Sequence, residues 1–168
     1  IYTTGYKTDS CVAIILKKTP LQLLSMRILV TGSEGFLGKV LCRQLRNNSH
    51  EVIGYDIANG SDILDSVQLR TAMADCDVCI HLAAIADLYI AEHQPELARN
   101  LNINATKSLL EIAEQLDVRV LFASTVCAYG NNGVAVCVEE SPLAPTEVYA
   151  ESKAEAEQLF YDKLDKHA

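Results

Sequence analysis

From Arg27 onward, short runs of β-branched and other apolar residues alternate with segments whose apolar residues recur every three or four positions. This alternation is typical of parallel strands joined by crossover helices. Strands are predicted at residues 27–31, 51–55, 77–83 and 119–124, and a minor strand with a short helix at 61–74. The pattern predicts a doubly wound parallel sheet of the α/β class, covered by helices on both faces. Its predicted strand order is 3-2-1-4-5, with the minor strand as the third.

Three longer helices are predicted between and after these strands. The first begins near Phe36 and ends near Asn47, and we expect it to bury Leu37, Val40, Leu41 and Leu45. The longest covers residues 95–116 and carries one apolar stripe. That stripe consists of Leu101, Ala105, Leu109, Ile112 and Leu116. A last helix is predicted at 149–164.

The chain has 168 residues, 49% of them hydrophobic, which is enough for one core and too short for two ordinary domains. Residues 1–25 show no clear pattern, so we expect an extension outside the fold and one domain over 26–168. The formal net charge of −8 argues against a nucleic-acid partner. No apolar stretch approaches the roughly 20 residues that cross a bilayer. We therefore expect a soluble, cytoplasmic protein without nucleic-acid or membrane partners.

Six cysteines are present, and Cys76 and Cys79 have the C-x-x-C spacing of some metal and redox sites. They run into the apolar segment 78–82 and have no second ligand pair elsewhere in the sequence. Packing cysteines in a buried strand are therefore favoured over a metal or redox site, and we expect reduced thiols.

A glycine-rich turn, Thr-Gly-Ser-Glu-Gly-Phe-Leu-Gly at 31–38, lies between the first predicted strand and the first helix. Gly32 permits a tight turn, Gly35 lets the backbone approach a pyrophosphate, and Gly38 lets the helix pack closely on the strand. The anion would then lie at the positive end of the helix. In this context the spacing predicts the dinucleotide-binding turn of a Rossmann fold.

Asp56 ends the second predicted strand, at about the expected distance beyond the glycines. Its carboxylate can accept hydrogen bonds from both hydroxyls of an adenosine ribose. A 2′-phosphate would meet a like charge there, and Ile57 and Ala58 supply no arginine, so NAD is predicted in preference to NADP. The alternative interpretation is an exposed aspartate in a turn.

Tyr149 and Lys153 are four residues apart and therefore share one helix face. A free phenol has a pKa of about 10 and is a poor base at neutral pH. A nearby ammonium and a positive nicotinamide ring would both favour the phenolate. The pair is thus a candidate general base, although the same spacing is common on helix surfaces.

Taken together, six ordered motifs resemble the extended short-chain dehydrogenase/reductase family, in its NAD-dependent epimerase/dehydratase group of the UDP-glucose 4-epimerase type. The motifs are Thr31 to Gly38, Asp56, Asp62-Ile63, His81-Leu82-Ala83-Ala84, Phe122 to Thr125 before Tyr129-Gly130, and Tyr149 to Lys153. The match runs from Met26 to the end of the chain. It implies the NAD-binding half of an enzyme, cut off before its substrate domain and expected to have little or no turnover alone.

The resemblance implies a role for each matching residue. It assigns Gly32, Gly35, Phe36, Leu37 and Gly38 to the pyrophosphate turn, Asp56 to the ribose, Asp62 and Ile63 to the adenine, and Leu82, Ala83 and Ala84 to the loop along the cofactor. Asn102 and Thr106 fit the family's Asn-x-x-Gly-Thr, with Ala105 in place of the glycine, and Asn102 would contact the cofactor. Ser124 and Thr125 are both catalytic candidates, and Thr125 would bind the reacting sugar hydroxyl. Tyr149 would be the base, and Lys153 would orient the nicotinamide ribose.

The implied reaction is epimerisation of a nucleotide sugar through a keto-sugar, with hydride passing to NAD and back. Thr125-Val126-Cys127 departs from the Thr-Asp-Glu of sugar-nucleotide dehydratases, which disfavours dehydration. Two alternatives stay open. One is a dehydrogenase or reductase of the same family, including a GDP-fucose synthase-like epimerase-reductase with Cys127 as its thiol, and the other is a non-catalytic NAD-binding sensor. The resemblance also implies a homodimer through a four-helix bundle of the helices at 95–116 and 149–164.

Overall fold

The computed structural model of the chain describes residues 13–16, 25–131, 136–138 and 141–165. Its sheet has the order β1-β5-β4-β2-β3. The strands are β1 (Ala13–Leu16), β2 (Arg27–Thr31), β3 (Glu51–Tyr55), β4 (Val78–His81) and β5 (Arg119–Ala123). β2 to β5 are parallel, and β2 lies between β3 and β4. The four main strands and their order are as predicted, so the doubly wound α/β fold is confirmed.

The predicted minor strand is wrong, because residues 61–65 form a turn and only the short helix α2 (Ser66–Met73) follows. The Asp62 carboxylate accepts the N–H of Leu64, and the Asp65 carboxylate accepts the N–H groups of Val67 and Gln68. These local hydrogen bonds use backbone donors that a strand would need for pairing. Among the described residues, β3 therefore forms that edge of the sheet.

Residues 13–16 of the expected extension form β1, which pairs antiparallel with β5. The pairing covers the edge of β5 with main-chain hydrogen bonds. Residues 1–12 and 17–24 lie outside the described residues, so the division of the chain at Met26 stays a prediction.

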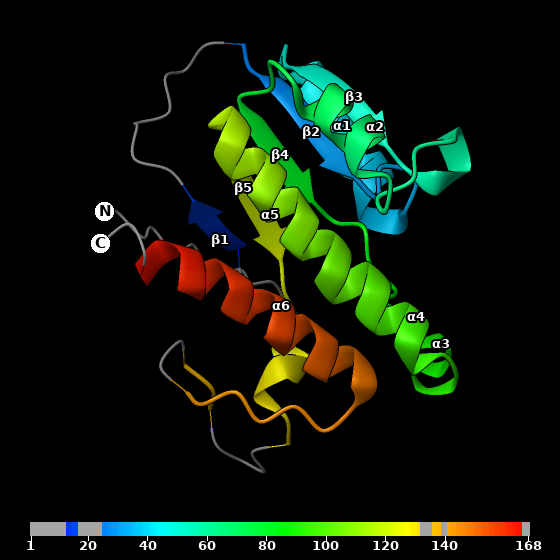
Figure 1. Cartoon of the computed structure of the whole chain (residues 1–168), viewed down its shortest axis with the longest axis vertical. Coiled ribbons are helices and arrows are strands. Elements are labelled where there is room, and N and C mark those ends of the chain that lie inside the picture. Colours follow the sequence, from blue (N-terminus) through cyan, green and yellow to red (C-terminus); the bar gives the residue numbers. More distant parts are fainter. Residues whose placement is uncertain (1–12, 17–24, 132–135, 139–140, 166–168) are drawn as a thin grey trace.

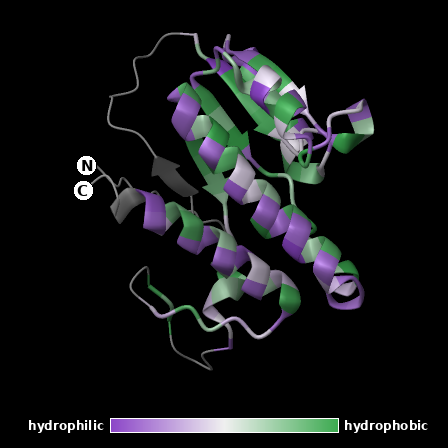
Figure 2. Ribbon diagram, viewed as in Figure 1, coloured by the Kyte–Doolittle hydropathy of each residue, from purple (hydrophilic) through white to green (hydrophobic). Residues whose placement is uncertain are grey.

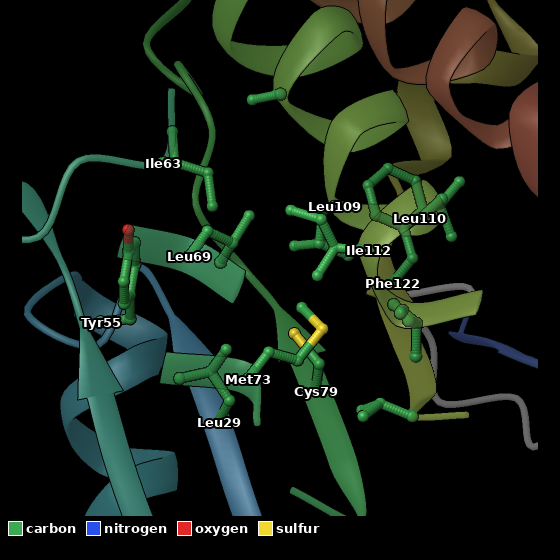
Figure 3. Packing of buried hydrophobic residues seen from close by; sticks show 14 of the residues in the cluster. Leu29, Tyr55, Ile63, Leu69, Met73, Cys79, Leu109, Leu110, Ile112 and Phe122 are labelled. Carbon is green, nitrogen blue, oxygen red and sulfur yellow. The ribbon is translucent and has the colours of Figure 1, made fainter. Parts of the chain in front are cut away.

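The helices cover the two faces of the sheet unequally (Figure 1). The larger hydrophobic cluster lies between the sheet and α2, α5 (Ala105–Leu116) and α6 (Val148–Asp165). Figure 3 shows its labelled side chains pointing into this shared interior, with Tyr55 and Leu29 from the sheet facing Leu109 and Ile112. The smaller cluster lies on the opposite face, under α1 (Phe36–Asn47). Helices on both faces give the expected three layers.

The bounds of α1 are as predicted, but its buried face is only partly so. Leu41 and Leu45 pack on the smaller cluster, whereas Leu37 and Val40 are 54% and 45% exposed. Gly38 and Cys42 take the buried positions instead. The physical reason is the missing side chain of Gly38, which brings that side of the helix against the glycine-rich turn.

The longest predicted helix is continuous but contains a π-turn. It runs as α4 (Pro95–Arg99), the π-helical η2 (Asn100–Asn104) and α5. Its predicted stripe faces the larger cluster, with Ala105, Leu109 and Ile112 buried. In Figure 2 the parallel strands are mostly green, while α5 and α6 alternate purple and green as expected for helices with one solvent face.

Four shorter elements complete the described chain. They are η1 (Ile57–Asn59), α3 (Leu88–His93), η3 (Val126–Tyr129) and the described residues 130–131, 136–138 and 141–147 between η3 and α6. None of the helices in the described parts of the chain has the length and apolar character needed to cross a membrane.

Candidate functional site

The glycine-rich turn follows β2 at the carboxyl edge of the sheet and lies against the loop that follows β4. Gly32 has φ +69°, and a Cβ there would lie 2.8 Å from the backbone nitrogen of Ala83. A Cβ on Gly38 would lie 2.1 Å from the carbonyl oxygen of Gly32. Only glycine fits either position, because turn, helix and loop meet backbone to backbone.

The amino end of α1 fits an anionic group. Its N-cap, Gly35, makes no side-chain capping bond, and the first turn holds no acidic residue. The first N–H groups of a helix have no acceptor within the helix and carry its positive dipole end. The Ser33 hydroxyl, in the glycine-rich turn and next to Gly54 of β3, is also buried without a hydrogen-bond partner in the described structure. These features suit the diphosphate of a dinucleotide.

Asp56 lies against the same turn, at the end of β3. One carboxylate oxygen accepts the N–H of Glu34 at 3.0 Å, and the other accepts the N–H of Ala58 at 2.9 Å. The carboxylate is therefore fixed beside the glycines, where the adenosine ribose was predicted. Phe36 and Leu37, at the open end of α1, are largely exposed.

The two residues predicted to meet the adenine differ in accessibility. Asp62 is exposed, and its carbonyl oxygen accepts the Tyr55 hydroxyl at 2.7 Å. Ile63 is only 8% exposed and belongs to the larger hydrophobic cluster. Their contact with an adenine ring stays a prediction.

A buried hydrogen-bond network begins at Thr31, the residue before Gly32. Its hydroxyl oxygen accepts the N–H groups of Leu82 and Ala83, both at 3.2 Å. Its own hydrogen then points to Nδ1 of His81, 2.7 Å away. Thr31 thus holds the start of the predicted cofactor loop 82–84 against the glycine-rich turn.

The network continues from His81 to the long helix. His81 Nε2 lies 2.9 Å from the Thr106 hydroxyl, which donates to the carbonyl of Asn102 at 2.7 Å. Because Nδ1 accepts, Nε2 carries the proton, and the neutral ring satisfies both neighbours. Burial, helped by the nearby charge of Lys153, lowers the pKa of His81 to about 3.

Asn102 joins the loop after β4 to α6, and the π-turn at η2 carries it. Its side-chain amide exchanges hydrogen bonds with the N–H and C=O of Ile85, at 2.8 and 3.1 Å, and donates to the Ser152 hydroxyl at 2.8 Å. The resemblance predicted a contact with the cofactor. Both N–H groups of this amide bind protein atoms, which holds the loop after β4, and a contact of Asn102 with the cofactor stays a prediction.

Helix α6 brings Lys153 to the carboxyl ends of β4 and β5. Lys153 is 4% exposed, and its Nζ lies 3.9 Å from the centre of the Phe122 ring. Tyr149, one turn earlier, is half-buried, and its carbonyl accepts the Ser152 hydroxyl. The first N–H of α6, at Val148, is bound by the carboxylate of Glu92 from α3, which fixes where the helix starts.

Ser124 and Thr125 follow β5 and have different partners. The Ser124 hydroxyl donates to the Glu157 carboxylate at 2.9 Å, inside the protein. Thr125 is half-buried, and its hydroxyl oxygen accepts the N–H of Cys127 to start η3. Of the two, Thr125 remains the candidate for a substrate contact. Glu157 was missed from sequence, although its place one turn after Lys153 on the buried face of α6 was the available signal.

The cysteines of the C-x-x-C pair are buried free thiols, and burial raises the pKa of both Cys76 and Cys79. A raised thiol pKa makes a thiolate unfavourable at neutral pH. Both side chains belong to the larger hydrophobic cluster, as expected for packing cysteines.

Comparison with known proteins shows extensive similarity. A model of the NAD dependent epimerase/dehydratase family matches residues 28–163. A D-erythronate dehydrogenase of Cupriavidus necator is 32% identical over 163 residues, covering 82% of this chain and 50% of the relative. A dTDP-4-dehydrorhamnose reductase of Mycolicibacterium smegmatis is 27% identical, covering 84% and 43%. The solved UDP-glucose 4-epimerase of Brucella ovis with NAD superposes with a TM-score of 0.78 at 25% identity, covering 84% and 48%. The chain spans about half the length of the curated relatives it matches.

Proposed function

Because the chain belongs to the NAD dependent epimerase/dehydratase family, we propose that it is the NAD-binding part of a sugar-nucleotide epimerase. The family is NAD-dependent and its members are enzymes. The whole protein's activity, its nucleotide-sugar substrate and the residue roles below are part of this proposal.

One observation carries the proposal: a hydrogen bond and a charge interaction connect the glycine-rich turn to Lys153 through His81. Thr31, next to Gly32, binds His81, and the charge of Lys153 acts on His81. The uncapped end of α1 and the cationic end of Lys153 thus belong to the same edge of the sheet. A dinucleotide with its diphosphate at α1 would extend along this edge.

In the proposed mechanism NAD supplies a hydride acceptor. Tyr149 takes the proton of a sugar hydroxyl as the C–H hydride leaves, so that the C–OH becomes C=O, and it returns the proton when the hydride comes back to the opposite face. Lys153 favours the phenolate form of Tyr149 through its positive charge and orients the nicotinamide ribose. Thr125 holds the reacting hydroxyl in place.

The Asp56 carboxylate supports NAD over NADP. It already binds the glycine-rich turn, so a 2′-phosphate at the ribose would meet its negative charge at close range. Ile57 and Ala58, which follow it, are exposed and carry no positive charge.

A second candidate is a dehydrogenase or reductase that releases the reduced or oxidised cofactor after one hydride transfer. The similarity to a D-erythronate dehydrogenase and to a dTDP-4-dehydrorhamnose reductase favours this candidate. The same residues would move the proton in both reactions, so these residues do not distinguish an epimerase from a dehydrogenase or reductase.

Turnover of UDP-sugars by the full-length protein separates the candidates. We expect interconversion of two epimers without net NADH, and a loss of about 10³-fold in kcat for Tyr149→Phe with NAD still bound. The control is Tyr89→Phe, an exposed tyrosine on α3, for which we expect unchanged turnover. Stoichiometric NADH would instead identify a dehydrogenase, and full activity of Tyr149→Phe would overturn the assigned base.

We further propose a homodimer formed through α4, α5 and α6, and a cytoplasmic location. The buried free thiols of Cys42, Cys76 and Cys79 support a reducing compartment. Light scattering at several concentrations measures the oligomeric state, and a monomer throughout would contradict the dimer.

A further inference from the structure

Glu157 is a charged side chain inside the protein that the mechanism above does not use. It is 4% exposed and lies on the inner face of α6, in the same helix turn as the buried Phe160. Burying a carboxylate is costly unless other groups pair with it. Its presence there requires partners from the surrounding elements.

Three groups face this carboxylate. The Ser124 hydroxyl at the end of β5 donates to it at 2.9 Å, and the Tyr161 hydroxyl on α6 also hydrogen bonds to it. The third is the ammonium of Lys153, one turn earlier on α6, whose positive charge favours the ionised carboxylate. Burial raises the pKa of Glu157, and these three groups oppose that effect.

Lys153 is itself buried and needs a negative partner. Its Nζ lies over the face of Phe122, whose ring stacks on Phe160 at 4.9 Å between centres. His81, whose pKa the Lys153 charge helps to lower, is neutral and does not compensate that charge. Glu157, one turn later on α6 and also buried, is a carboxylate on which the Lys153 charge acts.

We propose that Glu157 is a positioning residue of the active site: its buried carboxylate, anchored by Ser124, holds the Lys153 ammonium over Phe122 at the cofactor edge of the sheet. The role in the reaction rests on the proposed function, since Lys153 acts there on Tyr149 and the nicotinamide ribose. Ser124 is accordingly a support for Glu157 and does not contact substrate.

The position of Lys153 has a spectroscopic signature. Protons above an aromatic ring are shifted upfield by its ring current, so the ε-methylene of Lys153 should show an upfield NMR signal in the chain labelled with ¹³C-lysine. In Glu157→Gln, which keeps the size but removes the charge, we expect that signal to move toward the position of exposed lysines. We also expect NAD to bind about tenfold more weakly.

The matched control is Glu155→Gln on the same helix. Glu155 is an exposed carboxylate that pairs with Arg99 at 2.9 Å, so the same change of charge occurs outside the site. We expect the Lys153 signal to stay in place and NAD affinity to change by less than about twofold. An unmoved Lys153 signal in Glu157→Gln, or equal NAD affinity in both variants, would overturn the proposal.

Two further results keep the test decisive. Should Glu157→Gln fail to fold, Ser124→Ala removes only the anchoring hydroxyl, and we expect a smaller displacement of the Lys153 signal; no displacement would overturn the proposal. Should the wild-type chain bind no NAD, the proposed function fails, while the Lys153 signal still shows whether Glu157 holds the ammonium.

Discussion

Acidification from pH 7.5 to 4.5 is expected to remove roughly 2 to 3 kcal/mol of folding stability through His81 alone. The ring is fully buried, and its Nδ1 accepts the Thr31 hydroxyl while its Nε2 donates to Thr106. A second proton would point at a hydroxyl whose hydrogen is already directed at the ring. The Lys153 ammonium adds repulsion.

The direction of the effect follows from the pKa of His81, about 3 in the folded chain against about 6.5 in an unfolded one. Between these values the unfolded state binds the extra proton and the folded state does not. The stabilisation is therefore complete above pH 6.5, falls by about 1.4 kcal/mol per pH unit below it, and is gone near pH 3.

Urea denaturation of wild type and His81→Asn over this pH range isolates the histidine, because carboxylates titrate equally in both proteins. The variant loses a hydrogen bond and starts less stable. On acidification we expect the free energy of unfolding of wild type to fall by roughly 2 to 3 kcal/mol more than that of His81→Asn. A difference in unfolding free energy between the two proteins that does not change with pH would show that the ring is not held neutral.

Replacing Gly38 by alanine is expected to destabilise the chain by about 3 kcal/mol and to weaken NAD binding by about 100-fold or more. The added Cβ would lie 2.1 Å from the Gly32 carbonyl oxygen and 2.8 Å from the Ser33 Cα. Both neighbours are backbone atoms of the turn and cannot rotate away. Helix α1 must therefore move away from the turn and take its amino end with it.

Helix propensity alone gives the opposite expectation, since alanine is better than glycine within a helix by about 1 kcal/mol. Gly60→Ala is the control, because Gly60 has φ +85° with nothing within 4 Å of the added atom. It should cost about 1 kcal/mol from backbone strain and leave NAD binding unchanged. Thermal melts and calorimetry measure both effects. A Gly38→Ala variant more stable than wild type would contradict the contact.

The strands could be predicted because helices cover both faces of the sheet, so that β2, β4 and β5 are mostly buried and read as apolar runs between turn residues. The glycine-rich turn could also be predicted, because its glycines lie where two backbone segments come close together, as the structure shows at Gly32 and Gly38. Strand order followed from the doubly wound arrangement that alternating strands and helices predict.

Other features depend on contacts that periodicity does not encode. Leu37 and Val40 fit a helical stripe, yet the helix is rotated by a backbone contact at Gly38 that has no hydrophobic signal. The π-turn at η2 is a local irregularity that carries Asn102, whose amide binds Ser152 on α6, and helical periodicity does not predict it. The sequence places Glu157 one turn after Lys153, but only the fold brings Ser124 from the end of β5 to its carboxylate.

The order of Ser124 and Thr125 illustrates the same limit within the site. Adjacent residues at a strand end point to opposite sides, and the sequence alone could not tell which hydroxyl faces the interior. The structure directs Ser124 to Glu157 and leaves Thr125 at the start of η3. The roles of Tyr149 and Lys153 in chemistry stay predictions.

An NMR titration of the ¹⁵N-labelled chain with NAD is the most direct test of the central claim, that the open end of α1 and the edge of the sheet beside it bind a dinucleotide. We expect saturable shifts of the amide signals of Gly32 to Gly38, of Asp56 and of the loop 82–84, with little change for the exposed residues of α2. The absence of saturable shifts, or saturable shifts confined to residues far from the glycine-rich turn, would contradict it.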